Sequence, residues 1–423
     1  MNKSLYIVAF SLAFATTGIA QNNEGQDKTV DLGTQTTTEL RKTQAVSTIY
    51  SDELDKNATT SPYNAIYGLL PGLTVMQNTS WGTDKSRLNV RGRGSLNGDT
   101  PLFVVDGFAR PIEYINLSEI ESISVLKDGA ATALWGGRGA NGVVLITTKR
   151  GMYSKKEIKV DYKFGLGLPV NQPEFADAYT YAKARNEALR YDGLQPDMDE
   201  ASFLAGGNSD LYPNVDWQKE ALRNHTTSHQ LDITFRGGGK RLRYFSVLNY
   251  KNDMGLLNSK YTDYTDRYNS QMKKYFLNLR MNLDVDITDA TKLKLNMLGM
   301  LRETKRPTTS EATLFEQIFN TPSAAFPVQT QNGLWGSNNV LKTNPIANLA
   351  DVGYYKLNQR MLQADLRLIQ DLSVLTRGLS AELAIAYDNN ATYQETAKKS
   401  FMYQTIEKGT DCLLYTSDAA DDL

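Results

Sequence analysis

The residues of most obvious chemical interest are GRGANG, 137–142, which have the G-x-G-x-x-G spacing of a dinucleotide-binding turn. Glu157 stands about 20 residues beyond the first glycine, where such turns carry a carboxylate for the ribose. In a dinucleotide site, however, the glycines follow a strand and open a helix, whose N-terminal N–H groups hold the pyrophosphate. Here the helical stretch AATALW precedes the glycines and the β-branched stretch GVVLITTK follows them. This order predicts a helix end that turns into a strand, where glycine supplies positive φ.

The two histidines, His225 and His229, have the i, i+4 spacing that could bind a metal on a helix. They lie in HTTSHQLDIT, where a strand begins, and no carboxylate cluster adjoins them. We expect them to be polar loop residues. The basic stretch VRGRG (90–94) and the pair Lys149 and Arg150 suit salt bridges inside a packed unit. No Ser–His–Asp order or paired carboxylates suggest catalysis, so we expect neither an enzyme nor a cofactor or metal.

The composition restricts the class of protein. The 423 residues contain 46 Lys and Arg against 47 Asp and Glu, a balance that argues against nucleic-acid binding. The single cysteine, Cys412, excludes a disulfide framework and a cysteine metal site. No segment after residue 20 is apolar enough for a membrane helix, so the mature protein is expected to be soluble or to meet the membrane as a β-barrel.

The first residues predict export. Residues 5–15 form an apolar run that is too short to cross a bilayer, and Gly18 and Ala20 are the small residues that a signal peptidase needs. We expect residues 1–20 to be a signal peptide that is cleaved between Ala20 and Gln21.

The rest of the chain divides into four parts. Residues 21–43 are polar and predict a flexible periplasmic tether. Residues 44–151 have a compact α+β pattern, and 152–411 have strand periodicity. The final CLLYTSDAADDL, 412–423, resembles a translated transposon-adapter sequence, so we expect a non-native tail that ends a truncated reading frame. Within 44–151 the predicted elements are strands at Leu88–Val90, Leu102–Val105, Ser122–Leu126 and Val143–Thr148 and a helix at Ala130–Trp135.

The period of two is clearest in YFLNLRMNLDVDIT, which places Tyr275, Leu277 and Leu279 on one face and Asn278 and Arg280 on the other. About seven such strands are predicted, the others being near Ile158–Leu166, Leu231–Phe235, Leu242–Tyr250, Lys292–Leu301, Leu362–Leu368 and Leu379–Tyr387. Their connections alternate between long and short, as in a transmembrane barrel with short periplasmic turns and long outer loops.

Two further features favour a barrel over a soluble antiparallel sheet with one wet face, which explains the alternation equally well. The strands, at roughly 9 to 13 residues, suit a tilted membrane crossing. Tyr250, Tyr275 and Tyr387 are expected at the strand ends joined to long loops, where an aromatic girdle lies. We therefore predict an α+β domain followed by an incomplete antiparallel transmembrane β-barrel.

The stretches AVSTIYSDEL, NAIYGLLPGLTV, LNVRGRGSLNGDTPLFVVDG and IESISVLKDGAATALWGGRGANGVVLITTKRG closely resemble the plug domain of SusC/RagA TonB-linked outer-membrane transporters. The resemblance covers residues 45–151 and continues more weakly through YPNVDWQKEALRN and the strands after it. It implies a plug inside a barrel of about 22 strands.

The resemblance also implies a function: active import of glycan or peptide oligomers across the outer membrane of a Gram-negative bacterium. The implied partners are TonB, a SusD-like surface lipoprotein, the oligosaccharide or peptide substrate and outer-membrane lipids, with no nucleic acid. The candidate TonB box, which would add a strand to its partner's sheet, comprises Lys28, Thr29, Val30, Asp31, Leu32 and Gly33. The alternatives are a TonB-linked surface sensor and a secreted β-rich binding or adhesion protein.

Overall fold

The structure is a computed structural model that describes residues 10–12, 29–31, 36–38, 43–56, 59, 61–77, 86–94, 98–153, 156–170, 172–263 and 268–405. The predicted cleavage residues Ala20 and Gln21 and the tail at 412–423 lie outside these residues. Of the candidate TonB box, only Thr29, Val30 and Asp31 are described.

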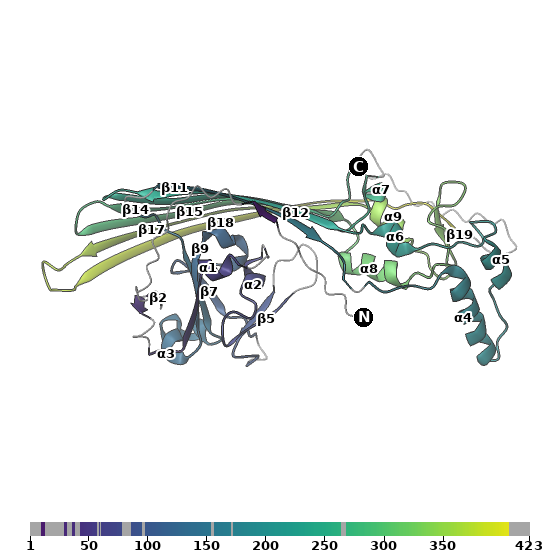
Figure 1. The fold of residues 1–423 in the computed structure, drawn as a ribbon, viewed down its shortest axis with the longest axis horizontal. Coiled ribbons are helices and arrows are strands. Elements are labelled where there is room, and N and C mark those ends of the chain that lie inside the picture. The colour runs from purple at the N-terminus through teal and green to yellow at the C-terminus, as the bar shows by residue number, and fades with distance from the viewer. Residues whose placement is uncertain are drawn as a thin grey trace.

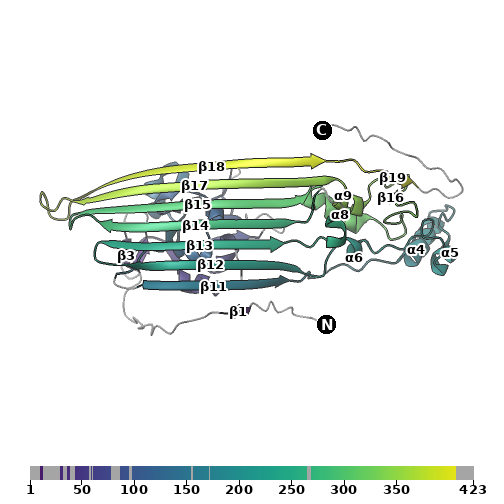
Figure 2. The same ribbon diagram turned by 90° about the horizontal axis from the view of Figure 1, so that it is seen from above.

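A long antiparallel sheet dominates the molecule (Figures 1 and 2). Its seven long strands lie side by side in chain order, which confirms the predicted succession of strands. They are β11 (Lys156–Gly167), β12 (Thr226–Gly238), β13 (Leu242–Met254), β14 (Lys273–Asp286), β15 (Thr291–Pro307), β17 (Gly353–Asp371) and β18 (Ser380–Lys398). In the described part of the chain the sheet does not close, because β18 pairs only with β17.

A short eighth strand, β1 (Phe10–Leu12), pairs antiparallel with β11 at the other edge. This strand lies within the segment that we predict to be a signal peptide. Cleavage at the predicted position would therefore expose the backbone groups of β11 at this edge.

The two faces of the sheet follow the period of two in the sequence. On β14, Leu277 and Leu279 are exposed, whereas Asn278, Arg280 and Asn282 are buried. The polar face lies against the domain formed by the preceding residues, since Asn278 and Arg280 contact Glu119. The apolar face is therefore on the side of the sheet that is turned away from that domain, the convex side of the ribbon in Figure 1. This is the arrangement of a barrel wall, in which lipid-facing and lumen-facing side chains alternate.

The connections also have the predicted rhythm. The segments 239–241, 287–290 and 372–379 are short turns at one end of the sheet, and 168–225, 255–272 and 308–352 are long loops at the other. The strands are longer than predicted, since β15, β17 and β18 have 17, 19 and 19 residues. Beyond the last apolar positions, both faces of these strands carry polar residues. A prediction based on alternating hydropathy therefore placed the strand ends too early.

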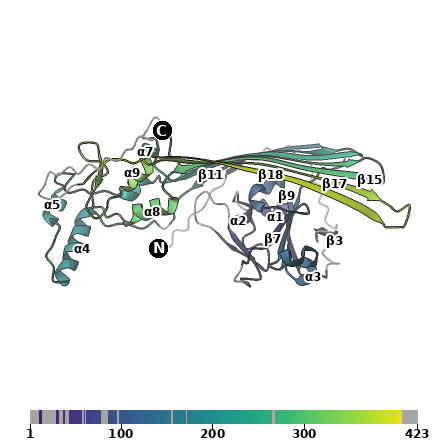
Figure 3. The same cartoon turned by 180° about the vertical axis from the view of Figure 1, so that it is seen from behind.

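The domain formed by the described part of residues 44–151, which the sequence predicts to be a plug and which we call the plug, lies beneath the concave face of the long sheet (Figures 1 and 3). Its sheet has the order β4-β9-β10-β7-β8. The bounds are β4 (Val46–Tyr50), β7 (Leu102–Val105), β8 (Phe108–Ala109), β9 (Ile120–Leu126) and β10 (Val143–Thr148), and a separate hairpin pairs β5 (Leu73–Met76) with β6 (Arg87–Val90). β9 and β10 are almost entirely buried, and β10 accordingly begins with the continuous apolar run Val143–Ile146, whereas β9 also buries Ser122 and Ser124.

Short helices complete the plug. They are α1 (Ser51–Leu54), α2 (Pro62–Ala65), α3 (Gly129–Thr132) and the 3₁₀ helices η1 (Ile112–Tyr114), η2 (Leu117–Glu119) and η3 (Ala133–Gly139). The single helix predicted at Ala130–Trp135 is therefore one turn of α-helix followed by 3₁₀ helix, and Gly136, at φ +53°, kinks the chain within the 3₁₀ segment.

The long loops fold together into one body at the end of the sheet, which we call the cap (residues 168–225, 255–263, 268–272, 308–352 and 399–405). Its core includes Trp217, Leu257, Phe326 and Trp335, which come from three different loops. Its elements are α4 (Ala178–Tyr191), α5 (Glu200–Ala205), α6 (Trp217–Ala221), α7 (Ser259–Thr262), α8 (Glu311–Asn320), α9 (Pro345–Ala350), β16 (Trp335–Ser337) and β19 (Tyr403–Thr405). Among the described helices, none combines the length and apolarity that a bilayer crossing needs.

One tyrosine is not where the sequence predicted it. Tyr250 and Tyr275 lie near the strand ends that join a long loop. Tyr387 lies near the middle of β18, paired with Ala364, because β18 continues through eleven further residues to Lys398.

Candidate functional site

The surface on which the plug meets the long sheet is the candidate functional site, and η2 positions its central carboxylate. Asn116 and Glu119 form a capping box around this turn. The Glu119 Oε1 atom accepts a hydrogen bond from the Asn116 backbone N–H at 3.2 Å, and the Asn116 side chain accepts one from the Ser118 N–H at 3.4 Å. Contacts within the turn thus orient the Glu119 side chain independently of its contacts with the sheet.

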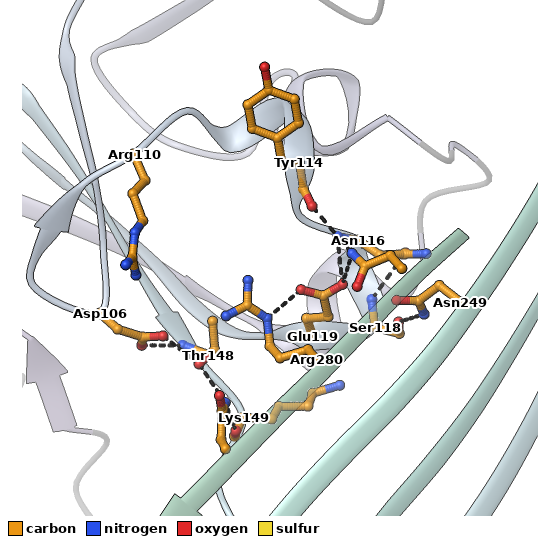
Figure 4. Close-up of polar contacts among 12 residues, drawn as sticks. Asp106, Arg110, Tyr114, Asn116, Ser118, Glu119, Thr148, Lys149, Asn249 and Arg280 are labelled. Atoms are coloured by element: carbon orange, nitrogen blue, oxygen red, sulfur yellow. Dashed lines mark hydrogen bonds and ion pairs between the residues drawn. The ribbon is translucent and has the colours of Figure 1, made fainter. Parts of the chain in front are cut away.

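Glu119 is bound by β14 (Figure 4). Arg280 Nε donates to Glu119 Oε2 at 2.5 Å, and Asn278 Nδ2 donates to Oε1 at 2.6 Å. The Glu119 side chain is fully buried and that of Arg280 is 3% exposed. Burial raises the pKa of the Glu119 carboxyl above its ordinary value, and Arg280, the Asn116 N–H and Asn278 oppose this rise. A buried carboxylate is tolerated here because its charge is paired and hydrogen-bonded.

A second set of contacts joins η2 to β12 and β13. Asn249 Nδ2 donates to Ser118 Oγ at 2.8 Å and to Asp232 Oδ1 at 2.9 Å. Asn116 Nδ2 donates to the same Asp232 oxygen at 3.3 Å. Three strands, β12 to β14, therefore meet one turn of the plug.

A third set lies at the turn after β7. Asp106 has φ +48°, and its carboxylate accepts from the Thr148 N–H at 3.0 Å and the Thr148 hydroxyl at 2.7 Å. Thr148 in turn accepts from Asn282 Nδ2 at 2.8 Å. The Asp106 carbonyl accepts from Arg367 at 3.0 Å, and a Cβ on Gly107 would lie 2.6 Å from that guanidinium. Glycine is favoured at 107 by its positive φ of +91°, and a larger residue would also displace the Arg367 guanidinium.

Arg110 of the plug makes the fourth set, with β17 and β18. Its Nη1 donates to Asp365 at 2.5 Å and its Nη2 to Asp388 at 2.7 Å. Arg110 and Asp365 are almost fully buried, whereas the Asp388 side chain is 43% exposed. One guanidinium therefore bridges two neighbouring strands.

Buried polar atoms without a protein partner are concentrated on the sheet side of this surface. Among the described residues they include side-chain atoms of Gln230, Asn249, Asn278, Arg280, Asn282 and Asn296. Groups of this kind bind ordered water in folded proteins, because leaving them unsatisfied costs about 1–3 kcal/mol each. An apolar contact of Tyr114 with Phe276, Leu298, Met300 and Met361 accompanies them. The plug thus rests on a mainly polar surface that is suited to hydration.

Among the hollows of the described residues, one adjoins this surface at Arg110 and another lies away from it in the cap. One of about 550 Å³ lies on the plug and is lined by Arg87, Arg110 and Arg138 with Tyr63 and Glu113 among others. Another of about 330 Å³ lies in the cap, where Tyr181, Phe203 and Phe326 line it beside Arg185 and Asp197.

The glycines of GRGANG have the predicted structural role. η3 ends at Gly139 and the chain turns into β10 through Gly142, whose φ is +87°. A Cβ on Gly142 would lie 2.8 Å from the Val90 side chain. Glu157 lies in β11, away from this turn in the chain.

The histidines are partly as predicted. His225 precedes β12, where its Nε2 lies 3.5 Å from Arg223. His229 is not a loop residue: it lies within β12, with Nδ1 2.7 Å from the Tyr162 hydroxyl and its ring against Phe164. Two of the basic residues form ion pairs: Arg93 pairs with Asp99 at 3.1 Å inside the plug, as expected, and Arg150 pairs with Asp284 of β14, on the long sheet, at 3.3 Å.

The candidate TonB box is described in part. Thr29–Asp31 form β2, which pairs antiparallel with β3 (Thr36–Thr38). Lys28, Leu32 and Gly33 lie outside the described residues. The assignment of Lys28–Gly33 as a TonB box stays a prediction.

Sequence reasoning missed Glu119, Arg110 and Asp106 as plug contacts. The sequence did contain a signal for their partners on the sheet, because Asn278, Arg280 and Asn282 alternate with apolar residues on β14. The pattern predicted a wet face, but which plug residues meet it depends on long-range docking that periodicity does not encode.

Comparison with known proteins agrees with this architecture. The family described as the TonB-dependent Receptor Plug Domain matches residues 38–143. Among curated proteins, TonB-dependent receptor SusC of Bacteroides thetaiotaomicron is 30% identical over 255 residues, which cover 56% of this chain and 24% of SusC. TonB-dependent receptor P26 of Formosa agariphila is 28% identical over 281 residues, 64% of this chain and 26% of that protein. The chain thus spans about a quarter of the length of these relatives.

Among solved structures, the RagAB peptide importer in its open-open state superposes with a TM-score of 0.70 at 20% identity. The match covers 88% of this chain and 43% of that one. The closed-closed state gives 0.67 at 19% identity, covering 84% and 41%. At this identity the likeness shows the fold alone: an α+β domain followed by a long antiparallel sheet.

Proposed function

We propose that this chain, SusC/RagA-like in its plug domain and in the sheet that follows, takes part in active import of oligomeric nutrients across the outer membrane of a Gram-negative bacterium. The nutrients are glycan or peptide oligomers. The energy comes from TonB, and a SusD-like surface lipoprotein is the partner at the cap side. No covalent chemistry is assigned, since the relatives named are receptors and importers.

The observation that carries the proposal is the docking of the plug on the concave face of the sheet. The contacts are mainly hydrogen bonds and ion pairs, and several buried polar atoms on the sheet lack a protein partner. A hydrated polar surface can exchange its hydrogen bonds for water, so a plug held in this way is easier to displace than one held by an apolar core. This property suits a channel that must open for cargo.

Uptake in cells tests the proposal. Cells that lack the complete gene should lose uptake of one labelled oligomer class, from parallel panels of oligosaccharides and peptides, and regain it on complementation. A protonophore should abolish the restored uptake. Unchanged uptake of every oligomer, or release of the protein into the medium without detergent, would favour the adhesion alternative.

The TonB box is tested at Val30. A strand added to a partner's sheet needs its backbone N–H groups, and proline removes one of them. Val30→Pro should abolish uptake while surface display of the protein stays normal, and Val30→Ile should keep uptake. Equal uptake in the two variants would place the TonB contact elsewhere.

A reversible tether tests whether the plug must move. Ser118 and Asn249 lie on opposite sides of the docking surface, and their Oγ and Nδ2 atoms are 2.8 Å apart. In a Ser118→Cys, Asn249→Cys variant, a short cleavable thiol cross-linker should stop uptake, and a reductant should restore it. Each single-cysteine variant treated with the same reagent is the control. Full uptake in the bridged protein would mean that this part of the plug stays docked during transport.

A further inference from the structure

The outward apolar face of the sheet ends abruptly on the side of the long loops. On β14, β15 and β17 the last outward leucines are Leu277, Leu301 and Leu362. Nearer the loops, the same face carries Tyr275, Lys273, Glu303, Lys305, Arg360, Asn358, Lys356 and Tyr354. The four strands β14 to β18 therefore extend past the apolar band as a charged rim.

Three lysines of this rim form a row across adjacent strands. Lys273 of β14 is the direct cross-strand partner of Lys305 of β15, and Lys305 is the partner of Lys356 of β17. Like charges directly opposite each other on one face of a sheet repel and destabilise the pair. Such a row is therefore expected where a negative charge from outside compensates it.

The carboxylates of the rim compensate the row only in part. Glu303 lies 3.1 Å from Lys305 Nζ and 3.4 Å from Lys356 Nζ. The other carboxylate, Glu395 of β18, is the direct cross-strand partner of Lys356 and accepts a hydrogen bond from the Tyr354 hydroxyl, so Lys273 at the other end of the row is the lysine farthest from both carboxylates in strand order. Counting Arg360 with the three lysines, the outward positions of these strands beyond the band carry four positive and two negative charges.

The opposite end of the same four strands differs. Val285, Thr291, Gln370 and Ala381 occupy the outward positions beside the short turns, and none of them is charged. The excess of positive charge therefore belongs to one edge of the apolar band only. The two edges of a membrane-spanning sheet meet different leaflets, so the asymmetry points to an anionic component of the leaflet on the long-loop side.

We propose that Lys273, Lys305 and Lys356 bind the phosphate groups of a glycolipid headgroup in that leaflet. Tyr250 and Tyr275 lie on the same face near the row, where aromatic side chains mark the membrane interface. Lysine stems lie along apolar surface while the ammonium groups reach the headgroups, and each basic residue near an anionic lipid surface contributes to binding. The proposal rests on the location in the outer membrane, and it holds whichever solute is imported.

Lipid binding to the purified protein tests the row. The protein, produced from its complete gene and freed of lipid in a non-ionic detergent, would be titrated with diphosphorylated lipid A, with the same lipid after phosphate removal, and with inorganic phosphate. Native mass spectrometry counts the lipids bound. Replacing all three lysines by glutamine should weaken binding of diphosphorylated lipid A by about fivefold per lysine and leave the dephosphorylated lipid unaffected.

Matched variants separate charge from folding. Replacing the three lysines by arginine should preserve binding, and Asn358→Gln, on the same face of β17, should change nothing. Lys273→Gln alone, at the end of β14, should lower affinity by about fivefold and provides a test if the triple variant fails to insert. Equal binding by the glutamine and arginine variants would overturn the proposal. Complete displacement of the lipid by equimolar inorganic phosphate would instead make the row a site for free phosphate. If the natural protein bound diphosphorylated lipid A but supported no uptake of any oligomer, the import proposal would fail and the lipid site would stand.

Discussion

At the scale of single residues, the docking surface depends on charges that are buried and paired. Glu119 and Arg280 are both nearly inaccessible, and Asn278 and the Asn116 N–H complete the hydrogen bonds of the carboxylate. Removing one partner of such a pair leaves the other charge buried without compensation, whereas removing both can be nearly neutral.

This asymmetry gives a prediction for Arg280. Arg280→Met should weaken docking of η2 by about 3–5 kcal/mol, and the double variant Glu119→Gln, Arg280→Met should recover part of the loss. Hydrogen exchange of residues 112–120 in the complete protein measures the effect. Leu279→Ala, on the opposite face of the same strand, is the control. A double variant that exchanges faster than Arg280→Met would show that the pair is not coupled.

Asp128 gives the plug a pH dependence. The Ala45 N–H, at 2.8 Å, and the Ala131 N–H, at 2.7 Å, hold the pKa of the Asp128 carboxyl below its ordinary value of 3.8. Because the folded pKa is lower than the unfolded one, the stabilisation is present above about pH 4 and is lost as pH falls through the lowered pKa. Exchange protection of residues 44–50 and 126–135 should fall in that range in the natural protein. It should stay flat in Asp128→Asn, which should already be less protected at pH 7 by about 1 kcal/mol.

At the scale of elements, the strands were predictable where one periodicity acts alone. β7 and β10 have the predicted bounds, and each of the seven long strands contains most of its predicted run, with only Leu379 before β18 and residues 287–288 after β14 outside. The ends of these strands were not predictable. Near the long loops, the outward positions that carry leucines elsewhere are occupied by residues such as Lys356 and Tyr393, so the apolar periodicity stops before the strand does. β4 and β5 are short and lack a distinctive pattern, since their pairing is set by tertiary contact with β9 and β6.

The depth of a residue on the outward face of β14 leads to a second mutational prediction. Leu279→Arg places a charge within the apolar band and should cost about 2–4 kcal/mol if it lies near the midplane, and Tyr275→Arg, nearer the rim on the same face, should cost about 0–1 kcal/mol. Folding yield into lipid vesicles measures both.

From periodicity alone, Asn278→Arg would be expected to cost little, but Asn278 is fully buried against Glu119, so that variant should disturb the plug instead. Equal losses of folding yield in Tyr275→Arg and Leu279→Arg would mean that the two positions do not differ in their depth within the apolar band.

At the scale of the whole molecule, the chain forms three bodies that meet at polar or mixed surfaces: the sheet, the plug beneath it and the cap at its end (Figure 1). The plug was recognisable from its own residues, but its docking partners and the joining of the loops were not. Loop residues such as Trp217 and Phe326 lie far apart in the sequence and carry no shared periodicity. Only the folded sheet brings their loops to the same end.

The joining of the loops gives a prediction for the cap. Trp217 is 3% exposed, its Nε1 donates to the Pro322 carbonyl at 3.1 Å, and its ring packs edge-on against Phe326 with centroids 5.3 Å apart. Trp217→Ala should therefore cost about 3–5 kcal/mol within the cap. Hydrogen exchange should rise in 308–352 as well as in the tryptophan's own loop, while β14 and the plug stay protected. Trp217→Phe should retain most of the protection. A rise confined to residues near 217 would show that the loops fold separately, and the cap would then not act as one surface toward a partner.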